Sequence, residues 1–304
     1  MDRNSLIYKR LKYIKEGIKN IPIFLMGNQN TLITNKYISD NYTFEIKEYE
    51  GRFGNNIQQI INGILFAKLT NNSFRSKKHP YIKNIDFNKN QESKIVANEF
   101  FYYYPHDFRR DLKIKDNLIY ENYPELARKY IYPNIKFVDD APLDQDTLVI
   151  HLRSGDNFGD REFNKKKNDF MIDTNPKSYF LEIINKFKKT IIVTEDDMKN
   201  PLIDELKKIS SVEIQSSSLE NDFNTLLNAR NLASSGISTF PIAAALCSKN
   251  IENFFYSNLI NKKHLNPTLL KNSNINLKPI KVENLKKAKE FKSYEAYCNY
   301  LISN

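Results

Sequence analysis

The sequence is poor in the residues that build disulfide frameworks and metal centres. Of its 304 residues, two are cysteine and four are histidine. Cys247 and Cys298 both fall in segments with a helical pattern, and no Cys-x-x-Cys pair or Cys/His cluster occurs. A disulfide-stabilised fold and a structural zinc site are therefore not expected.

A long apolar run is also missing. No segment approaches the roughly 20 apolar residues that a membrane-spanning helix needs. The first 27 residues are basic, but charges interrupt them, and they show neither the apolar stretch nor the cleavage site of a signal peptide. We expect a cytoplasmic protein. An amphipathic pattern over residues 4–18 predicts a surface helix, either solvated or touching an anionic membrane at the inner face of the cell.

What the sequence does contain is an ordinary globular mixture with an excess of positive charge. Hydrophobic residues make up 40% and charged residues 27%, and the formal net charge is +10. Such a charge favours anionic partners, namely phosphorylated small molecules, nucleic acid or a membrane surface, although an AT-rich genome also produces it. Because no nucleic-acid-binding module occurs, a basic nucleic-acid-binding protein stays only the alternative class, and no nucleic acid partner is expected.

The chain divides by pattern into two α/β halves, residues 1–145 and 146–304. In the first, alternation over residues 42–49 predicts a strand, and a Gly-Arg-Phe-Gly-Asn turn then leads into an amphipathic helix with isoleucine at 57, 60, 61 and 64. Residues 75–145 have an irregular pattern. The sequence "APLDQD" closes this half with turn residues.

In the second half, strand and helix patterns alternate. Strands are predicted at 148–152, 190–194, 211–215 and 253–257, with helices between them and a closing helix over about 282–302. This spacing predicts a parallel, doubly wound sheet, which binds ligands at the carboxyl ends of its strands.

Three loops at such positions carry polar chemistry. In "HLRSGD", residues 151–156, Arg153 follows a buried strand, where a guanidinium can bind phosphate oxygens through two parallel hydrogen bonds. In "SSGISTFPIAAAL", Ser238 or Thr239 can cap a helix beginning near Pro241, whose free N–H groups suit a phosphate. In "TEDD", residues 194–197, carboxylates can accept hydrogen bonds from a ribose or base. The Asp-x-Asp at 144–146 matches a manganese pattern, but it precedes a strand, which favours a spacer loop.

Together these motifs resemble the fucosyltransferase superfamily. "GRFGNNIQQIINGILFAKLTNNSF" is similar to the "GRFGNQ…FAK" signature of the protein O-fucosyltransferases, and "HLRSGD" to their "HLR" and to the "H-x-R-R-G-D" of bacterial α1,2-fucosyltransferases. "TIIVTEDD" resembles the strand and "TDD" of the α1,6 branch, and "LASSGISTFPIAAALCSKNI" the "S-x-S-T-F…AA" of the α1,2 branch. The motifs occur in family order over about residues 45–255.

The resemblance implies a GT-B-like fold, in which two Rossmann-type domains face each other across a cleft. It implies an inverting transfer from a nucleotide sugar, without a metal or other cofactor, onto a glycan or lipid-linked saccharide acceptor in surface polysaccharide synthesis. GDP-fucose is the leading donor. By position, the catalytic residues would be Arg153, Arg52 and Asp156, and the donor-binding residues Gly54, Asn55, His151, Asp196, Ser238, Thr239 and Phe240.

The sequence departs from the family at three positions. Ser154 stands where the bacterial enzymes have a second arginine, which opens the alternative of another nucleotide-sugar donor on the same fold. Phe53 and Asn56 replace the leucine and glutamine of the α1,2 pattern. The acceptor, the linkage, the oligomeric state and the general base, for which Asp156 and Asp196 are candidates, stay open.

Overall fold

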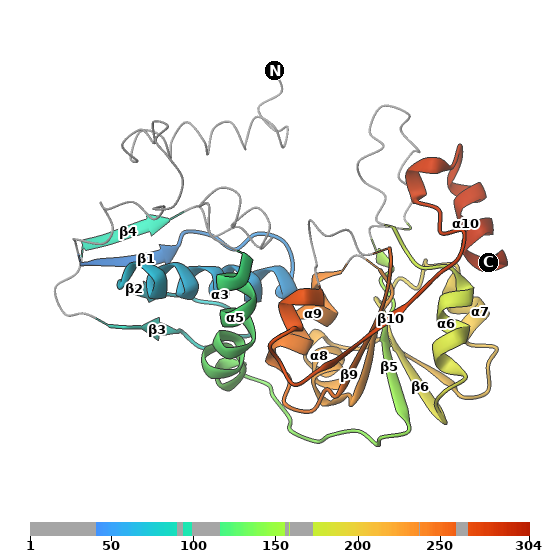
Figure 1. Cartoon of the computed structure of the whole chain (residues 1–304), viewed down its shortest axis with the longest axis horizontal. Helices are drawn as coiled ribbons and strands as arrows, with labels where there is room; N and C mark the ends of the chain where they lie inside the picture. The colour runs from blue at the N-terminus through green and yellow to red at the C-terminus, as the bar shows by residue number, and fades with distance from the viewer. Residues whose placement is uncertain are drawn as a thin grey trace.

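In the part of the chain that the structure describes, the protein has an α/β fold with two sheets of unequal size (Figure 1). The computed structural model describes residues 41–89, 94–98, 116–155, 158, 173–236, 238–259 and 267–304. The predicted helix over residues 4–18 and the candidate Asp156 lie outside them. Within this part of the chain, no helix combines the length and apolar content needed to cross a bilayer.

The smaller sheet is built around a β–α–β unit. Strand β1 (Tyr42–Ile46) leads through helix α3 (Phe53–Thr70) to β2 (Ser73–Arg75), which pairs with β1 in parallel. Strands β4 (Lys94–Asn98) and β3 (Asp86–Phe87) complete the order β3-β2-β1-β4, with β3 antiparallel. The predicted strand at 42–49 is therefore confirmed but shorter.

Helix α3 is more buried than its amphipathic pattern predicted. Ile57, Ile60, Ile61 and Ile64 are fully buried, as expected. Its polar side chains Gln58, Gln59, Asn56 and Asn62 are also buried, because α3 packs against β1 and β2 of its own half, against α5 (Asp116–Leu126), and against α9 (Thr239–Cys247) of the second half. A short π-helical turn, η1 (Ala127–Ile131), and a 3-10 turn, η2 (Tyr132–Asn134), follow α5. Residues 75–145, whose sequence pattern is irregular, thus contain strands and a helix that were not predicted.

The larger sheet confirms the predicted parallel architecture. Among the described residues it has six strands in the order β10-β9-β8-β5-β6-β7, all parallel. The strands are β5 (Thr147–His151), β6 (Lys189–Val193), β7 (Val212–Gln215), β8 (Asn231–Ser234), β9 (Asn253–Ser257) and β10 (Asn276–Ile280). In chain order this is the 3-2-1-4-5-6 arrangement of the Rossmann fold.

Helices cover both faces of this sheet (Figure 1). On one face, Leu148 and Ile150 of β5 share a core with α6 (Lys177–Ile184), α7 (Leu202–Leu206) and α10 (Tyr294–Ser303). On the other, Val149 joins a core with α8 (Leu219–Asn228), α9 and α3. The second core continues into the first half of the chain, so the two halves share apolar side chains.

The sequence prediction needs correction at the C-terminal end. Strands β8 and β10 were not predicted, and residues 282–287 are not helical. The closing segment consists of a 3-10 turn, η5 (Ala288–Glu290), and helix α10, and another 3-10 turn, η4 (Pro267–Leu270), follows β9. Helix α7 is short and ends at Leu206. Cys247 and Cys298 do lie in helices, α9 and α10, and both are free thiols.

Candidate active site

A cavity of about 400 Å³ lies at the carboxyl edge of the larger sheet, where the first half of the chain covers it. It is at the point where the strand order reverses: the chain runs from β5 to β6 and β7 on one side, then returns to β8 on the other. Open parallel sheets bind ligands at such a point. The cavity is lined by Arg52, Phe53, Gly54, Asn55, His151, Arg153, Val193, Thr194, Glu195, Asp196, Ser217, Leu219, Asp222, Ser238, Thr239 and Phe240.

The loop after β5 is fixed from both neighbouring strands. The Arg153 N–H donates to Ser235 Oγ at 3.3 Å, after β8. On the other side, the Asn200 side chain donates to the Arg153 carbonyl at 2.8 Å. These bonds hold the backbone from which the Arg153 side chain enters the cavity.

Ser154 stands where the α1,2-fucosyltransferase pattern has a second arginine. Its side chain is fully buried, its Oγ accepts from the Asn200 N–H at 3.0 Å, and its own N–H donates to Glu195. An arginine at this enclosed position would require the loop to rearrange. Ser154 thus packs within the loop and is not among the residues that line the cavity.

Arg52 is held by a turn that α3 itself braces. Gly51 has φ of +71°, a left-handed value that glycine adopts without strain. The Asn56 side chain donates to the Glu50 carbonyl at 3.0 Å, and the Gln59 side chain accepts from the Glu50 N–H at 2.9 Å. Two buried amides of the first helical turns thus orient the segment that carries Arg52.

The N-termini of α3 and α9 meet at the cavity. Gly54, in the first turn of α3, touches the backbone of Thr239 and Phe240, which open α9. Ser238 caps α9 by accepting from the Phe240 N–H at 3.4 Å, as predicted, although the helix begins at Thr239, two residues before Pro241. Neither helix has an acidic residue in its first turn, and residues of both first turns line the cavity, so both positive dipole ends lie at it.

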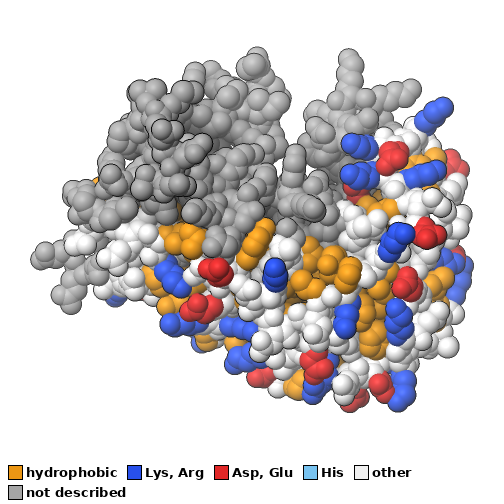
Figure 2. Space-filling view, viewed as in Figure 1, with side chains coloured by type: hydrophobic (Ala, Val, Ile, Leu, Met, Phe, Trp, Pro, Cys, Tyr) orange, Lys and Arg blue, Asp and Glu red, His pale blue; other side chains and the backbone are white. Residues whose placement is uncertain are grey.

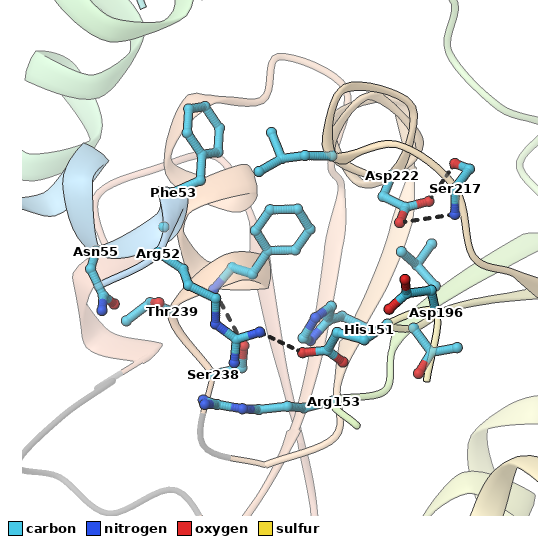
Figure 3. A pocket seen from close by; sticks show the side chains of 16 residues that line it. Arg52, Phe53, Asn55, His151, Arg153, Asp196, Ser217, Asp222, Ser238 and Thr239 are labelled. Carbon is cyan, nitrogen blue, oxygen red and sulfur yellow. Dashed lines mark hydrogen bonds and ion pairs between the residues drawn. The ribbon is translucent and has the colours of Figure 1, made fainter. Parts of the chain in front are cut away.

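An ion pair joins the two halves of the chain across the cavity. Arg52 Nη1 lies 2.9 Å from Glu195 Oε1, and a dashed line from Arg52 marks the pair in Figure 3. The other carboxylate oxygen of Glu195 accepts from the Ser154 N–H at 2.5 Å. Burial raises the pKa of Glu195, but the hydrogen bond from the Ser154 amide and the charge of Arg52 oppose it, so the pKa lies below its usual value and the carboxylate is ionised at neutral pH.

His151 lies in the middle of these charges as a neutral side chain. It is 5% exposed, and its ring lies 5.3 Å from that of Phe240. Burial, together with Arg153 and Arg52 and against the opposing effect of Glu195, lowers its pKa to about 4. The cations at the cavity at neutral pH are therefore the arginines.

The opposite side of the cavity is acidic. Figure 3 shows Asp222 and Ser217 on the side away from Arg52 and Arg153, with His151 and Asp196 between them. Asp222 accepts from Ser217 Oγ at 2.7 Å and from the Gln215 side chain at 2.8 Å. The side chains of Leu219 and Phe240 form an apolar part of the cavity wall. The cavity thus has a cationic end and an acidic end.

The structure brings together all the predicted site residues that it describes. Arg52, Gly54 and Asn55 come from the first half, and the rest from the end of β5, the loops after β5, β6 and β8, and the start of α9 (Figure 3). The Asp144–Asp146 pair lies elsewhere, with Asp146 bonded to Lys188. Among the described residues, no group of three or more His, Cys, Asp or Glu is arranged to hold a metal ion.

Sequence reasoning missed Asp222 and did not single out Glu195, although it named the carboxylates of "TEDD" as candidate hydrogen-bond acceptors. For Glu195 a signal was present, because Ile191 and Val193 of β6 face the core shared with α3, and continuing this alternation brings Glu195 to the same side. Asp222 gave no comparable signal. It lies inside α8, after a strand whose loop carried no motif, and it reaches the cavity only through the packing of α8 on the sheet.

Comparison with known proteins finds similarity among solved structures only. No family model and no curated protein matches the chain. A structure of POFUT1 in complex with GDP is similar over 79% of this chain and 99% of that chain, with 12% identity and a TM-score of 0.38. For POFUT1 in complex with GDP-fucose the coverages are 71% and 97%, with 13% identity and a TM-score of 0.36. For NodZ α1,6-fucosyltransferase soaked with GDP-fucose they are 69% and 93%, with 10% identity and a TM-score of 0.34.

Proposed function

We propose that this protein is a glycosyltransferase that uses a nucleoside-diphosphate sugar. The observation that carries the proposal is the cavity at the strand-order reversal, where two arginines and two helix N-termini converge opposite an acidic end. Its volume of about 400 Å³ lies within the range of small-molecule sites. The reaction class, transfer of a sugar, comes from the sequence motifs that resemble those of the fucosyltransferase superfamily.

The cationic end suits the diphosphate. Arg153 and Arg52 can each donate paired hydrogen bonds to phosphate oxygens, and the amides at the starts of α3 and α9 add donors and a positive potential. The acidic end suits the nucleoside, because Asp222 and Asp196 can accept hydrogen bonds from N–H groups of a base or hydroxyls of a ribose. Leu219 and Phe240 would contact the planar base.

Arg153 would stabilise the leaving group. Breaking the bond between sugar and diphosphate places negative charge on the phosphate oxygen and positive charge on the sugar. The backbone of Arg153 is fixed on both sides, so its guanidinium can stabilise the negative charge on the phosphate oxygen without reorganising during the reaction. Arg52, which enters from the other half, would contact the sugar, the outer phosphate or the acceptor.

The acceptor hydroxyl would lose its proton to a carboxylate or to water. His151 is unsuited as the base because it is buried and its pKa lies near 4. Asp196 lines the cavity and remains a candidate, as does Asp156 outside the described residues.

The finer assignments rest on the sequence motifs. They are a GT-B-like pair of Rossmann-type domains divided near residue 145, an inverting and metal-independent transfer, and fucose from GDP-fucose with a glycan or lipid-linked saccharide as acceptor. A different nucleotide sugar on the same fold is the second candidate, because Ser154 stands where the α1,2 pattern has a second arginine.

A thermal-shift panel with GDP, UDP, CMP and their sugar conjugates tests the proposal. One nucleotide and its sugar conjugate should raise the melting temperature of the wild type and not that of Arg153→Ala. Arg75→Ala is the matched control, since it removes an arginine paired with Glu45 and Asp86 outside the cavity. If no nucleotide shifts the wild type, the proposal fails.

Binding of duplex DNA or RNA in a salt titration would instead support the nucleic-acid class. On the described part of the face shown in Figure 2, lysine and arginine side chains are interspersed with acidic ones.

A further inference from the structure

We propose that Glu195 is an internal anion that occupies Arg52 until a diphosphate ligand displaces it. This inference rests on the proposed function, since it concerns regulation of the same cavity. It makes Glu195 a positioning residue, which acts on the ligand through Arg52.

The Glu195 carboxylate sits where an anion has its best partners. One oxygen bonds the Arg52 guanidinium and the other accepts from the Ser154 backbone amide. The carboxylate also lies against Gly155, where an added Cβ would be 3.5 Å from Glu195 Oε1. A guanidinium and a backbone amide are the donors that proteins use to bind phosphate, so the chain holds its own carboxylate with them.

The two contacts of Glu195 differ in how easily they break. The Ser154 amide belongs to a buried loop, whereas the Arg52 side chain is 57% exposed. An ion pair with one partner this exposed contributes little to stability, because water and salt screen it. Charge-assisted bonds to a doubly charged diphosphate are stronger, so exchange of Arg52 from Glu195 to the ligand is favourable.

The backbone at Arg52 allows such an exchange. The turn that carries Arg52 is braced by Asn56 and Gln59 through the Glu50 backbone, and these bonds do not involve the guanidinium. The long side chain can therefore change partner while the turn stays in place. The pair joins residues 143 positions apart in the chain and links its two halves at the cavity.

Replacing Glu195 by glutamine separates this role from a structural one. The glutamine oxygen can still accept from the Ser154 N–H, but the side chain no longer attracts Arg52 or repels a phosphate. We expect Glu195→Gln to bind both the preferred nucleoside diphosphate and inorganic pyrophosphate about fivefold more tightly, or more, by titration calorimetry. Glu45→Gln, which breaks the Arg75 ion pair outside the cavity, should change neither affinity.

A double-mutant cycle tests the route through Arg52. In the Arg52→Ala background, Glu195→Gln should tighten pyrophosphate binding clearly less than in the wild type. Unchanged or weaker binding to Glu195→Gln overturns the inference, and so does an equal gain in both backgrounds.

The outcomes also separate this inference from the proposed function. If nucleotides bind the wild type but Glu195→Gln binds them no more tightly, the proposal that a ligand displaces Glu195 is wrong and the proposed function stands. If pyrophosphate binds with the predicted gain but no nucleotide is preferred over it, the inference stands and the nucleotide-sugar function falls. If Glu195→Gln does not fold, Glu195→Asp gives a second test: its carboxylate is one methylene shorter and holds Arg52 less well, so it should also bind pyrophosphate more tightly than the wild type, and unchanged or weaker binding overturns the inference.

Discussion

Gly54 lies against the backbone of Thr239, so closely that a Cβ on Gly54 would come within 2.8 Å of the Thr239 carbonyl carbon and oxygen. This contact is where the first turn of α3 meets the first turn of α9. It brings residues from the two halves of the chain to one cavity.

Gly54→Ala should be destabilising. Alanine favours the helix over glycine by roughly 1 kcal/mol, but the new methyl group would meet backbone atoms, which cannot turn away as a flexible side chain can. Overpacking of this kind costs about 1–3 kcal/mol, so we expect a net loss of stability in chemical denaturation together with weaker nucleotide binding. Equal or higher stability with normal binding would show that the helix ends can separate without consequence.

Arg52→Ala should damage turnover more than folding. Its pair with Glu195 involves a half-exposed arginine, so the free energy of unfolding should fall by no more than about 1 kcal/mol. Loss of a cation at the diphosphate should reduce kcat by about 100-fold, by analogy with other preorganised donors. Denaturation and steady-state kinetics on the same preparation, beside Arg75→Ala, measure both. A large loss of stability with unchanged kcat would show that Arg52 supports the fold and does not act on the diphosphate.

Asp222→Asn should weaken nucleotide binding selectively. Asp222 lies at the acidic end, and a hydrogen bond to a charged group contributes about 1.5–3 kcal/mol, so affinity for the nucleoside diphosphate should drop about tenfold or more. Inorganic pyrophosphate, which occupies only the cationic end, should bind as in the wild type. Asp146→Asn, outside the cavity, is the control. An equal loss for both ligands would mean that Asp222 maintains the whole cavity and does not bind the nucleoside.

Stability should fall on mild acidification because of two buried histidines. Burial lowers the pKa of both His151 and His79 from 6.5 to about 4. Below pH 6.5 the unfolded chain therefore binds protons that the folded chain does not. The stabilisation is present above pH 6.5 and is lost as pH falls towards 4, at up to about 1.4 kcal/mol per pH unit for each histidine.

Urea denaturation between pH 5 and 7 measures this slope, and His151→Gln should reduce it. Glu195 contributes in the same direction but at lower pH, because its depressed pKa gives stabilisation that is lost as pH falls through the folded value. In the upper part of this pH range, the slope of stability against pH therefore reports on the histidines. An unchanged slope in His151→Gln would contradict a neutral, buried His151.

Local patterns predicted much of the scaffold. Isoleucines at helical spacing located α3, and the apolar runs before "HLRSGD" and "TEDD" located β5 and β6. Strand β8 was hidden because its four residues, Asn-Leu-Ala-Ser, show neither a long apolar run nor strong β-formers. Strand β10 was hidden because it contains a proline and lies at the edge of the sheet.

The sequence by itself determined which side chains stand at strand ends and helix starts, because periodicity and turn chemistry are local properties of a few adjacent residues. It thereby located Arg52, Arg153 and Ser238. Only the tertiary structure decided that Glu195 meets Arg52, that Asp222 reaches the cavity from α8, and that Gly54 lies against Thr239. These relationships join segments far apart in the chain, and they depend on strand order and on how two helices approach, which no local pattern records.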